Sequence, residues 1–398
     1  MRLKSALRRG VAAAVIAGIV VSSGIPAYAK TWNIADGDIT VKGASDESGN
    51  YNNVKQGEKD FEKDEGETVI TGESDKNTVT IDTSEGNVDV TFDDLKIDVS
   101  GKKEGDGSGK TEVDGSGKTE GNVSDETEGD VSGDSPVDAG KAAVTVQGDH
   151  DAAIELDGDN ELKSGGYHAG LEKNEHESEG TLTIKDDKGK DGSLTAEGGF
   201  GGAGIGGGKE SSGATNIEIT GDALVSAGSS GSAAIGSGES STGETTINIH
   251  DTNPEKGVKS AFAYGGAGIG SGRYAKGKTY VTISNASVST LETPAASTNT
   301  SGAGIGTGAA IGSGSEGDVF SPPTGDPNTF KTIIRITDSN VTASSGPSAA
   351  IGSGSYSTNA TEIHINGGKI EASNYSGSAI GSGDSAKGKT GIYITGSN

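Results

Sequence analysis

The chain has no cysteine, one tryptophan and one methionine among its 398 residues. Without cysteine, no disulfide framework, thiolate metal site or cysteine nucleophile can form. Aromatic residues make up 4% and hydrophobic residues 30% of the chain, whereas glycine occupies 69 positions. Such a composition lacks the large side chains of an ordinary globular core. It leaves either disorder or a repetitive β-fold with glycine-rich corners.

Basic residues are also scarce, because 32 Lys and Arg stand against 58 Asp and Glu, for a formal net charge of −26. Such acidity argues against nucleic acids and anionic membrane surfaces as partners. The charge is uneven: residues 30–195 hold 42 acidic and 17 basic residues, whereas residues 196–398 hold 16 and 11. The downstream half is therefore close to neutral.

The N-terminus predicts a secretory signal peptide over residues 1–29. Four of the first nine residues are basic, Val11–Val21 is an apolar run, and Ala27-Tyr28-Ala29 is a small-x-small cleavage site. The apolar run is too short to span a membrane. We therefore expect cleavage after Ala29, a secreted protein that is associated with the cell surface, and no transmembrane segment in the mature chain.

A six-residue phrase, Ala-x-Ile-Gly-x-Gly or a close variant, returns through the second half of the chain. Its isoleucines are separated by 30, 34, 36, 6, 40 and 29 residues. A period near 30 residues indicates a repeat architecture. The copies lie at Ala203–Gly208, Ala233–Gly238, Ala267–Gly272, Ala303–Gly308, Ala309–Gly314, Ala349–Gly354 and Ser378–Gly383.

Between these phrases lie strands of the form Thr-x-Ile/Val-x-Ile, such as Thr215–Ile219 and Thr245–Ile249. A weaker strand follows most of them, for example Ala223–Ala227, and the Ile-Gly phrase supplies a third side. The fold class predicted is all-β, a parallel β-helix or β-solenoid with about three strands per coil of about 30 residues. Alternation places Ile217 and Ile219 inside and the intervening residues outside.

The composition divides the mature chain into three parts. Residues 30–100 carry irregular β-like segments and are expected to form an N-terminal β cap or the first irregular coils. Residues 101–140 are acidic, rich in Gly and Ser and nearly free of large apolar residues, which predicts a disordered insertion. Residues 141–398 form the repeats. Because the repeats run almost to Asn398, we expect a truncated chain or an uncapped final coil.

The run GYHAGLEKN, GTLTIKDD, GSLTAEGG and GAGIGGG over residues 165–208, followed by the repeated phrases, resembles a known family. It is similar to the secreted or wall-attached repeat proteins of clostridia and related Gram-positive bacteria, described as carbohydrate-binding-domain or adhesin-like proteins. The resemblance covers residues 30–398 apart from the insertion. Its motifs are specific for the family but not for an activity. The first hypothesis is a non-enzymatic, secreted or surface-associated adhesin or polysaccharide-binding protein, whose partners are polysaccharides or host and cell-surface glycans.

Two cofactor motifs fail on inspection. Gly202–Gly207 matches G-x-G-x-x-G, but another strand follows where a dinucleotide site needs a helix, so no nucleotide is expected. Oxygen-rich turns at Asp36–Asp38, Asp157–Asn160 and Asp186–Asp187 contain the ligand types that calcium prefers, but none has a complete series. We therefore predict no cofactor and no metal site, with calcium as the one candidate ion.

An enzymatic alternative is a β-helix polysaccharide lyase or hydrolase, which needs a cation or base beside carboxylates on an outward strand face. Arg335, Glu362 and His364 occupy outward positions that adjacent coils can bring together. A stalk without any ligand is the third alternative. If the protein is a non-enzymatic binding protein, no catalytic residue is assigned.

Aromatic residues flank several Ile-Gly phrases. If the coils stack in register, these aromatic residues line one edge of the rod, one per coil. There their rings can stack on the apolar faces of sugars. A purely structural role in covering corner loops is the alternative. The candidate glycan-contacting residues are Tyr167, Tyr264, Tyr274, Tyr356 and Tyr375.

Overall fold

The computed structural model describes residues 30–47, 49–64, 66–101, 140–173, 179–189, 191–263, 266–292, 309–314, 331–346, 348–374 and 377–396. The predicted signal peptide and nearly all of the predicted insertion, residues 102–139, lie outside these ranges. Among the described residues, no helix has the length and apolar character needed to cross a membrane.

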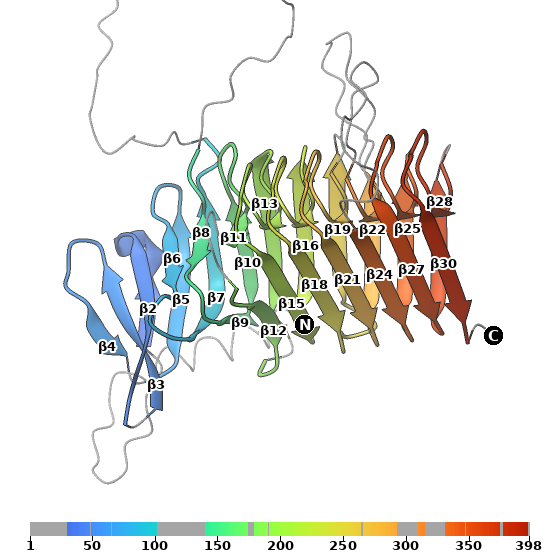
Figure 1. Ribbon diagram of the computed structural model, residues 1–398. Coiled ribbons are helices and arrows are strands. Elements are labelled where there is room, and N and C mark those ends of the chain that lie inside the picture. The colour runs from blue at the N-terminus through green and yellow to red at the C-terminus, as the bar shows by residue number, and fades with distance from the viewer. Residues whose placement is uncertain are drawn as a thin grey trace, which may run out of the picture.

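The chain winds into a parallel β-solenoid that runs as a rod from the N-terminal to the C-terminal coils (Figure 1). This confirms the predicted fold class. One circuit passes through β15 (Thr215–Gly221), β16 (Leu224–Ser230) and β17 (Ile235–Gly236) before β18 (Thr245–His250) pairs in parallel with β15. Successive coils therefore stack strand on strand along three sides.

The first side carries the Thr-x-Ile-x-Ile strands and their upstream counterparts. Besides β15 and β18 it contains β1 (Lys30–Asn33), β5 (Thr68–Ser74), β7 (Val88–Asp98), β9 (Ala152–Asp157), β12 (Leu182–Asp186), β21 (Thr279–Ser284), β24 (Lys331–Thr337), β27 (Ala360–Asn366) and β30 (Thr390–Thr395).

The second side continues from the C-terminal half of β7, which pairs with β10. Besides β16 it contains β10 (Asp159–Lys163), β13 (Ser193–Phe200), β19 (Val258–Ala263), β22 (Ser287–Glu292), β25 (Asn340–Ser345) and β28 (Lys369–Asn374).

The third side is made largely of the short Ile-Gly strands. Besides β17 it contains β2 (Ile39–Asp46), β6 (Val79–Asp82), β8 (Val144–Gln147), β11 (Leu171–Lys173), β14 (Ile205–Gly206), β20 (Ile269–Gly270), β23 (Ile311–Gly312), β26 (Ile351–Gly352) and β29 (Ile380–Gly381).

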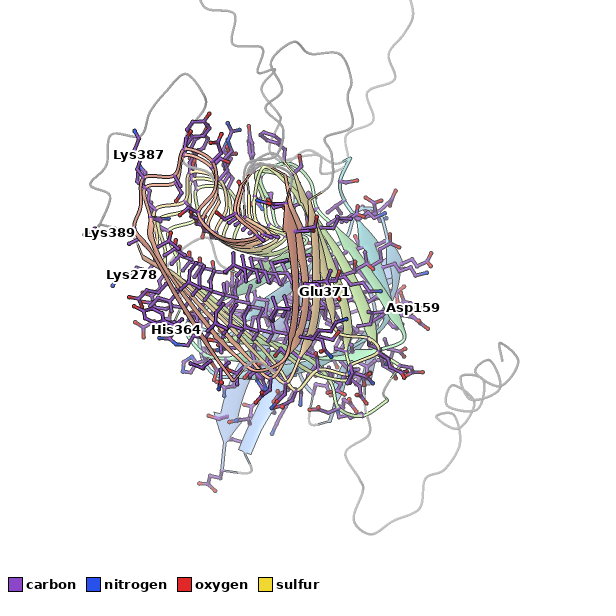
Figure 2. The ribbon with its side chains drawn as sticks, turned by 90° about the vertical axis from the view of Figure 1, so that its right-hand side faces the viewer. Asp159, Lys278, His364, Glu371, Lys387 and Lys389 are labelled. Atoms are coloured by element: carbon purple, nitrogen blue, oxygen red, sulfur yellow. The ribbon has the colours of Figure 1, made fainter. Side chains whose placement is uncertain are left out.

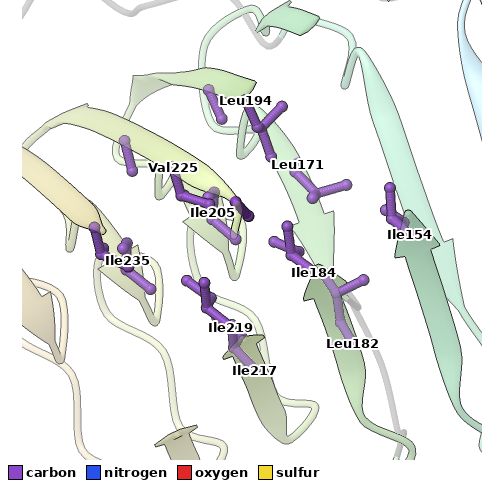
Figure 3. Close-up of a cluster of buried hydrophobic side chains, with 14 of the residues drawn as sticks. Ile154, Leu171, Leu182, Ile184, Leu194, Ile205, Ile217, Ile219, Val225 and Ile235 are labelled. Carbon is purple, nitrogen blue, oxygen red and sulfur yellow. The ribbon is translucent and has the colours of Figure 1, made fainter. Parts of the chain in front are cut away.

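The core is one apolar column along the rod axis. Ile217 and Ile219 are 1% and 0% exposed, and they pair in register with Ile247 and Ile249 of the next coil, as the alternation predicts. Side chains from all three sides converge on this column, as the buried cluster around Ile205 shows (Figure 3). Each coil closes its core only by stacking on its neighbours.

The first coils differ from the rest by an antiparallel hairpin. After η1 (Ile34–Asp36), a 3-10 turn, β2 turns back into β3 (Gly49–Gln56), and β4 (Glu62–Asp64) pairs antiparallel with β3. Strand β2 also pairs in parallel with β6, so the hairpin continues the third side at its first edge. It projects from the N-terminal end of the rod (Figure 1).

Candidate ligand-binding site

A hollow of about 390 Å³ lies where the β3 hairpin meets the outward face of the first side. We call it the β3 cleft. Strands β7, β9 and β12 form its floor, because alternate residues of these strands point away from the core. The lining residues used below are Asn50, Tyr51, Asn52, Glu67, Asn87, Asp89, Thr91, Glu155, Lys185 and Lys188.

Glu155, on β9, is the most constrained carboxylate of the cleft. Its Oε1 accepts the backbone N–H groups of Asp187 and Lys188, both at 2.8 Å. Its Oε2 lies 3.8 Å from Lys185 Nζ, too far for a hydrogen bond, and has no hydrogen-bond partner among the described residues although the residue is only 5% exposed. A buried acceptor without a donor costs free energy, so Glu155 is well suited to accept a hydrogen bond from a ligand hydroxyl.

Glu67 sits on the opposite wall of the cleft. Its Oε1 accepts hydrogen bonds from Thr91 Oγ1 at 2.6 Å and from Lys188 Nζ at 2.7 Å. Burial alone raises the pKa of this carboxyl, but the hydrogen bonds from Lys188 and Thr91 outweigh burial and hold the pKa below 4.5. Glu67 is therefore ionised at neutral pH and suits accepting hydrogen bonds better than donating a proton.

The hairpin contributes an aromatic ring and amides. Tyr51 is half-buried, and Lys63 Nζ lies 4.2 Å from the centre of its ring. Asn52 is fixed by hydrogen bonds from its Nδ2 to Asp89 O at 2.7 Å and to Thr68 Oγ1 at 2.9 Å. These bonds hold β3 against β7. The cleft thus combines an aromatic ring, amides, carboxylates and lysines within one hollow.

Three of the tyrosines predicted from the sequence, Tyr167, Tyr274 and Tyr356, lie on loops that flank the Ile-Gly strands. The backbone N–H of Tyr167 donates to Phe200 O at 3.0 Å, and its carbonyl accepts from the N–H of Lys209, whose Nζ lies 4.7 Å from the Tyr167 ring centre. Because Lys209 directly follows a phrase, Tyr167 adjoins the loop that leaves the next coil.

Tyr274 and Tyr356 share one position, the second residue after a phrase, with φ of 58° and 59°. Arg273 Nη2 donates to Tyr274 Oη at 2.6 Å, and its guanidinium carbon lies 4.5 Å from the ring centre. A cation therefore covers one face of the ring. The other two candidates, Tyr264 and Tyr375, lie outside the described residues, so the complete edge of tyrosines stays a prediction.

Strand register brings together the residues of the enzymatic alternative. Arg335 on β24 pairs with His364 on β27, and Glu362 Oε2 lies 3.8 Å from His364 Nε2. The His364 ring stacks on Tyr393 of β30, with centroids 4.7 Å apart and an interplanar angle of 12°. A shallow hollow of about 240 Å³ adjoins Arg335, His364 and Tyr393.

The acidic turns considered for calcium are engaged in local hydrogen bonds. Asp38 Oδ1 accepts from Thr78 N at 2.7 Å, and Asp186 Oδ2 accepts from Gly192 N at 2.8 Å. Asn160 Oδ1 accepts from Leu95 N at 2.9 Å. In the part of the chain that the structure describes, no group of three or more His, Asp or Glu side chains is placed to hold a metal ion.

Sequence reasoning missed the β3 cleft. The alternation of β9 places Glu155 outward, but nothing local distinguishes it from other outward carboxylates. The donors of its Oε1 come from a turn 32 and 33 residues downstream, and the wall that faces it is a hairpin about 100 residues upstream. Only the stacking of coils brings these segments together.

No family model, curated protein or solved structure matches the chain.

Proposed function

We propose that this protein is a non-enzymatic, secreted or cell-surface β-solenoid that binds polysaccharide through the β3 cleft. Glu155 carries the proposal, because its fixed carboxylate lacks a hydrogen-bond donor on Oε2 and lines a hollow beside a tyrosine ring. Sugars present apolar ring faces for stacking and hydroxyl groups that donate to carboxylates. The leader-like residues 1–29 and the resemblance to surface repeat proteins support the extracellular location.

The experiment is a glycan array probed with the mature chain, followed by titration calorimetry on each positive glycan. Glu155→Gln retains one acceptor for the backbone N–H groups and should weaken binding about tenfold, the effect of one hydrogen bond to a charged group. Tyr51→Ala should weaken it about threefold to tenfold by removing the ring.

Glu161→Gln is the matched control, because it neutralises a partly exposed carboxylate on the second side, away from the cleft. It should leave the affinity unchanged. Normal glycan affinity in folded Glu155→Gln and Tyr51→Ala proteins would exclude the cleft as the binding site. Silence of the array would favour a stalk without a ligand.

A polysaccharide lyase or hydrolase is the second candidate, favoured by the proximity of Arg335, Glu362 and His364 on one face. A reducing-sugar assay, with ultraviolet absorbance to detect unsaturated products, tests it on every glycan that binds. Product that is lost in His364→Gln would replace the binding proposal by an enzymatic one, whereas binding without product supports the first.

A further inference from the structure

The pentapeptide Ala-Lys-Gly-Lys-Thr occurs twice, at Ala275–Thr279 and Ala386–Thr390, each time between an Ile-Gly phrase and a strand of the first side. The two loops have the same backbone hydrogen bonds. Lys276 N donates to Ser241 O and Lys387 N donates to Ser357 O, both at 2.8 Å. Each loop therefore presents its two lysines in the same way, at the entry to β21 and to β30.

Between these loops the outward face of β21, β24, β27 and β30 carries Arg335 and His364. Arg335 is exposed, and the register continues from Thr282 through Arg335 and His364 to Tyr393. Glu362 is the only acidic residue at the outward positions of these four strands. We call this surface the basic face, and define it by Lys276, Lys278, Arg335, His364, Lys387, Lys389 and Tyr393.

Several lysines elsewhere in the described part of the molecule form ion pairs, unlike the lysines of the basic face. Lys163 and Lys369, on the second side, lie 2.7 and 2.6 Å from Glu161 and Glu371. The four lysines of the basic face and Arg335 have no acidic partner within 4 Å among the described residues, although the chain carries a net charge of −26.

Figure 2 shows where four side chains of the basic face lie. In the view from the C-terminal end, Lys278, His364, Lys387 and Lys389 lie along one side of the cross-section, whereas Glu371 and Asp159 lie away from them. The lysines and Arg335 carry like charges that repel one another, and Glu362 is the one acidic side chain among the outward residues of β21, β24, β27 and β30. An anionic partner that bridges neighbouring coils would relieve this repulsion.

The residues that line the hollow on this face indicate which chemical groups the partner carries. Arg335 offers a planar fork of donors that matches a carboxylate. His364 Nε2 is buried without a hydrogen-bond partner among the described residues, and Tyr393 is 55% exposed. Asn366, Thr337 and Thr395 line the same hollow with amide and hydroxyl groups. A ligand that offers a carboxylate, hydroxyl groups and an apolar ring face would match these residues, and an acidic sugar has all three.

We propose that the basic face binds an acidic polysaccharide, with a uronate carboxylate on Arg335, a sugar ring against Tyr393 and further carboxylates on the paired lysine loops. From β21 to β30 the face spans about 14 Å at strand spacing, which accommodates several sugar residues. Nucleic acid has a much denser charge, which the acidity of the whole chain opposes. This site lies on coils far along the rod from the β3 cleft and does not depend on that cleft being a glycan site.

The test measures binding of polygalacturonate, alginate and hyaluronate to the mature chain by calorimetry in 50 and 300 mM NaCl. Methyl-esterified polygalacturonate is the neutral control, and single-stranded DNA is the control for unspecific attraction of polyanions. We expect at least one uronate polymer to bind, with weaker binding in high salt, and we expect no binding of the esterified polymer.

Arg335→Gln should lower that affinity about tenfold or more, as loss of a charge-assisted hydrogen bond does. Arg335→Lys, which keeps the charge and loses the fork, should recover only part of it. Lys387→Gln combined with Lys389→Gln should also weaken binding, whereas Lys369→Gln, a paired lysine on the second side, should not. Thermal unfolding verifies that each variant is folded.

Three results would overturn the proposal: no uronate polymer binds, DNA binds as tightly as the best of them, or Arg335→Gln binds normally. Glu155→Gln separates the two sites, because it should leave uronate binding at the basic face intact. If Glu155→Gln rather than Arg335→Gln abolishes uronate binding, the β3 cleft is the site and the basic face is not.

Discussion

His250 contacts the preceding coil through one ring nitrogen and the turn that follows its own strand through the other. Nε2 lies 3.0 Å from Glu218 Oε1, and Nδ1 lies 3.1 Å from Asp251 Oδ2. Thr183 Oγ1 donates to Glu218 Oε2 at 2.8 Å, and Asn285 Nδ2 donates to Asp251 Oδ1 at 3.3 Å. When His250 is protonated, the chain of contacts crosses from β12 to the turn after β21.

The pH dependence of this contact follows from its pKa values. The hydrogen bond to Glu218 is the main reason that the pKa of His250 lies above 6.5, and the bond to His250 is the main reason that the pKa of Glu218 lies below 4.5. The His250 contribution is therefore complete below pH of about 6.5 and lost as pH rises through its raised pKa. The Glu218 contribution is lost as pH falls through its lowered pKa.

We predict that His250→Gln lowers the melting temperature more at pH 5.5 than at pH 8.5. The side chain is 32% exposed and solvent screens the contact, so the effect at pH 5.5 should be a small shift rather than loss of the fold. Thermal scans of the wild type and the variant across this range measure the difference, and His364→Gln serves as a control histidine. An equal shift at both pH values would contradict a charged His250.

At the scale of the element, each Ile-Gly strand depends on the glycine after its buried isoleucine. At Gly270 φ is +142°, a region that side chains with a Cβ rarely adopt. A Cβ built there would also meet Gly312 O of the next coil at 1.8 Å. Both the backbone angle and the close stacking of coils therefore require glycine.

We predict that Gly270→Ala lowers the free energy of unfolding by about 3 kcal/mol or more, from backbone strain and the clash together. Gly228→Ala on β16 is the matched control, because its added Cβ would have only Glu197 Cγ nearby, at 3.8 Å. Urea unfolding followed by circular dichroism compares the two variants. Similar losses for both would show that the third side does not constrain Gly270.

The degenerate copy of the phrase explains where glycine is dispensable. In β11, Glu172 takes the place of this glycine and pairs with Gly206. Its carboxylate accepts from the N–H of Ala169 at 2.8 Å and lies 3.0 Å from His168 Nδ1. Glu172 is not among the residues with positive φ, so this strand has a different backbone and uses a side chain to hold the loop.

The serine at the fifth position of the phrase has a structural role that the sequence did not reveal. Ser237 Oγ accepts from Gly272 N at 3.1 Å, and Ser271 Oγ accepts from Gly314 N at the same distance. These hydroxyls are buried and link each coil to the next. In the sequence this position is Ser in most copies but Gly207 in one and Thr307 in another, which suggests a tolerant site rather than a ladder of hydrogen bonds.

Strand register could be predicted because it depends on local pattern. Alternation in Thr-x-Ile-x-Ile decides which residues enter the core, and the threonine that begins each copy aligns successive copies, as Thr245 pairs with Thr279. The copies at Ala303–Gly308 and Ala309–Gly314 lie six residues apart, and spacing does not show which of them stacks in the column. The described column continues through Ile311, which pairs with Ile269 and Ile351, and Ile305 lies outside the described residues.

The candidate sites could be predicted only where they follow that register. The proximity of Arg335 and His364 is a consequence of adjacent strands, and the sequence suffices to propose it. The β3 cleft depends on an antiparallel hairpin that folds onto the first side, and its closure rests on Asn52 contacting Asp89 and Thr68. Neither contact has a periodic signal.

At the scale of the whole molecule, stability is the sum of contacts between neighbouring coils. Ile249 and Ile394 occupy equivalent positions of one column, but Ile249 is fully buried between β15 and β21, whereas Ile394 on β30 is 53% exposed. Truncating the same side chain should therefore have very different costs at the two places.

We predict that Ile249→Ala lowers the free energy of unfolding by about 2–5 kcal/mol, because it removes buried methyl groups and leaves a cavity. Ile394→Ala should cost less than about 1.5 kcal/mol, since half of its surface is already in water. In hydrogen exchange, Ile249→Ala should speed exchange in β15, β18 and β21 together, because each interface supports both of its coils, whereas Ile394→Ala should affect β27 and β30 alone. Equal costs, or exchange that changes in β18 only, would contradict a column whose stability passes from coil to coil.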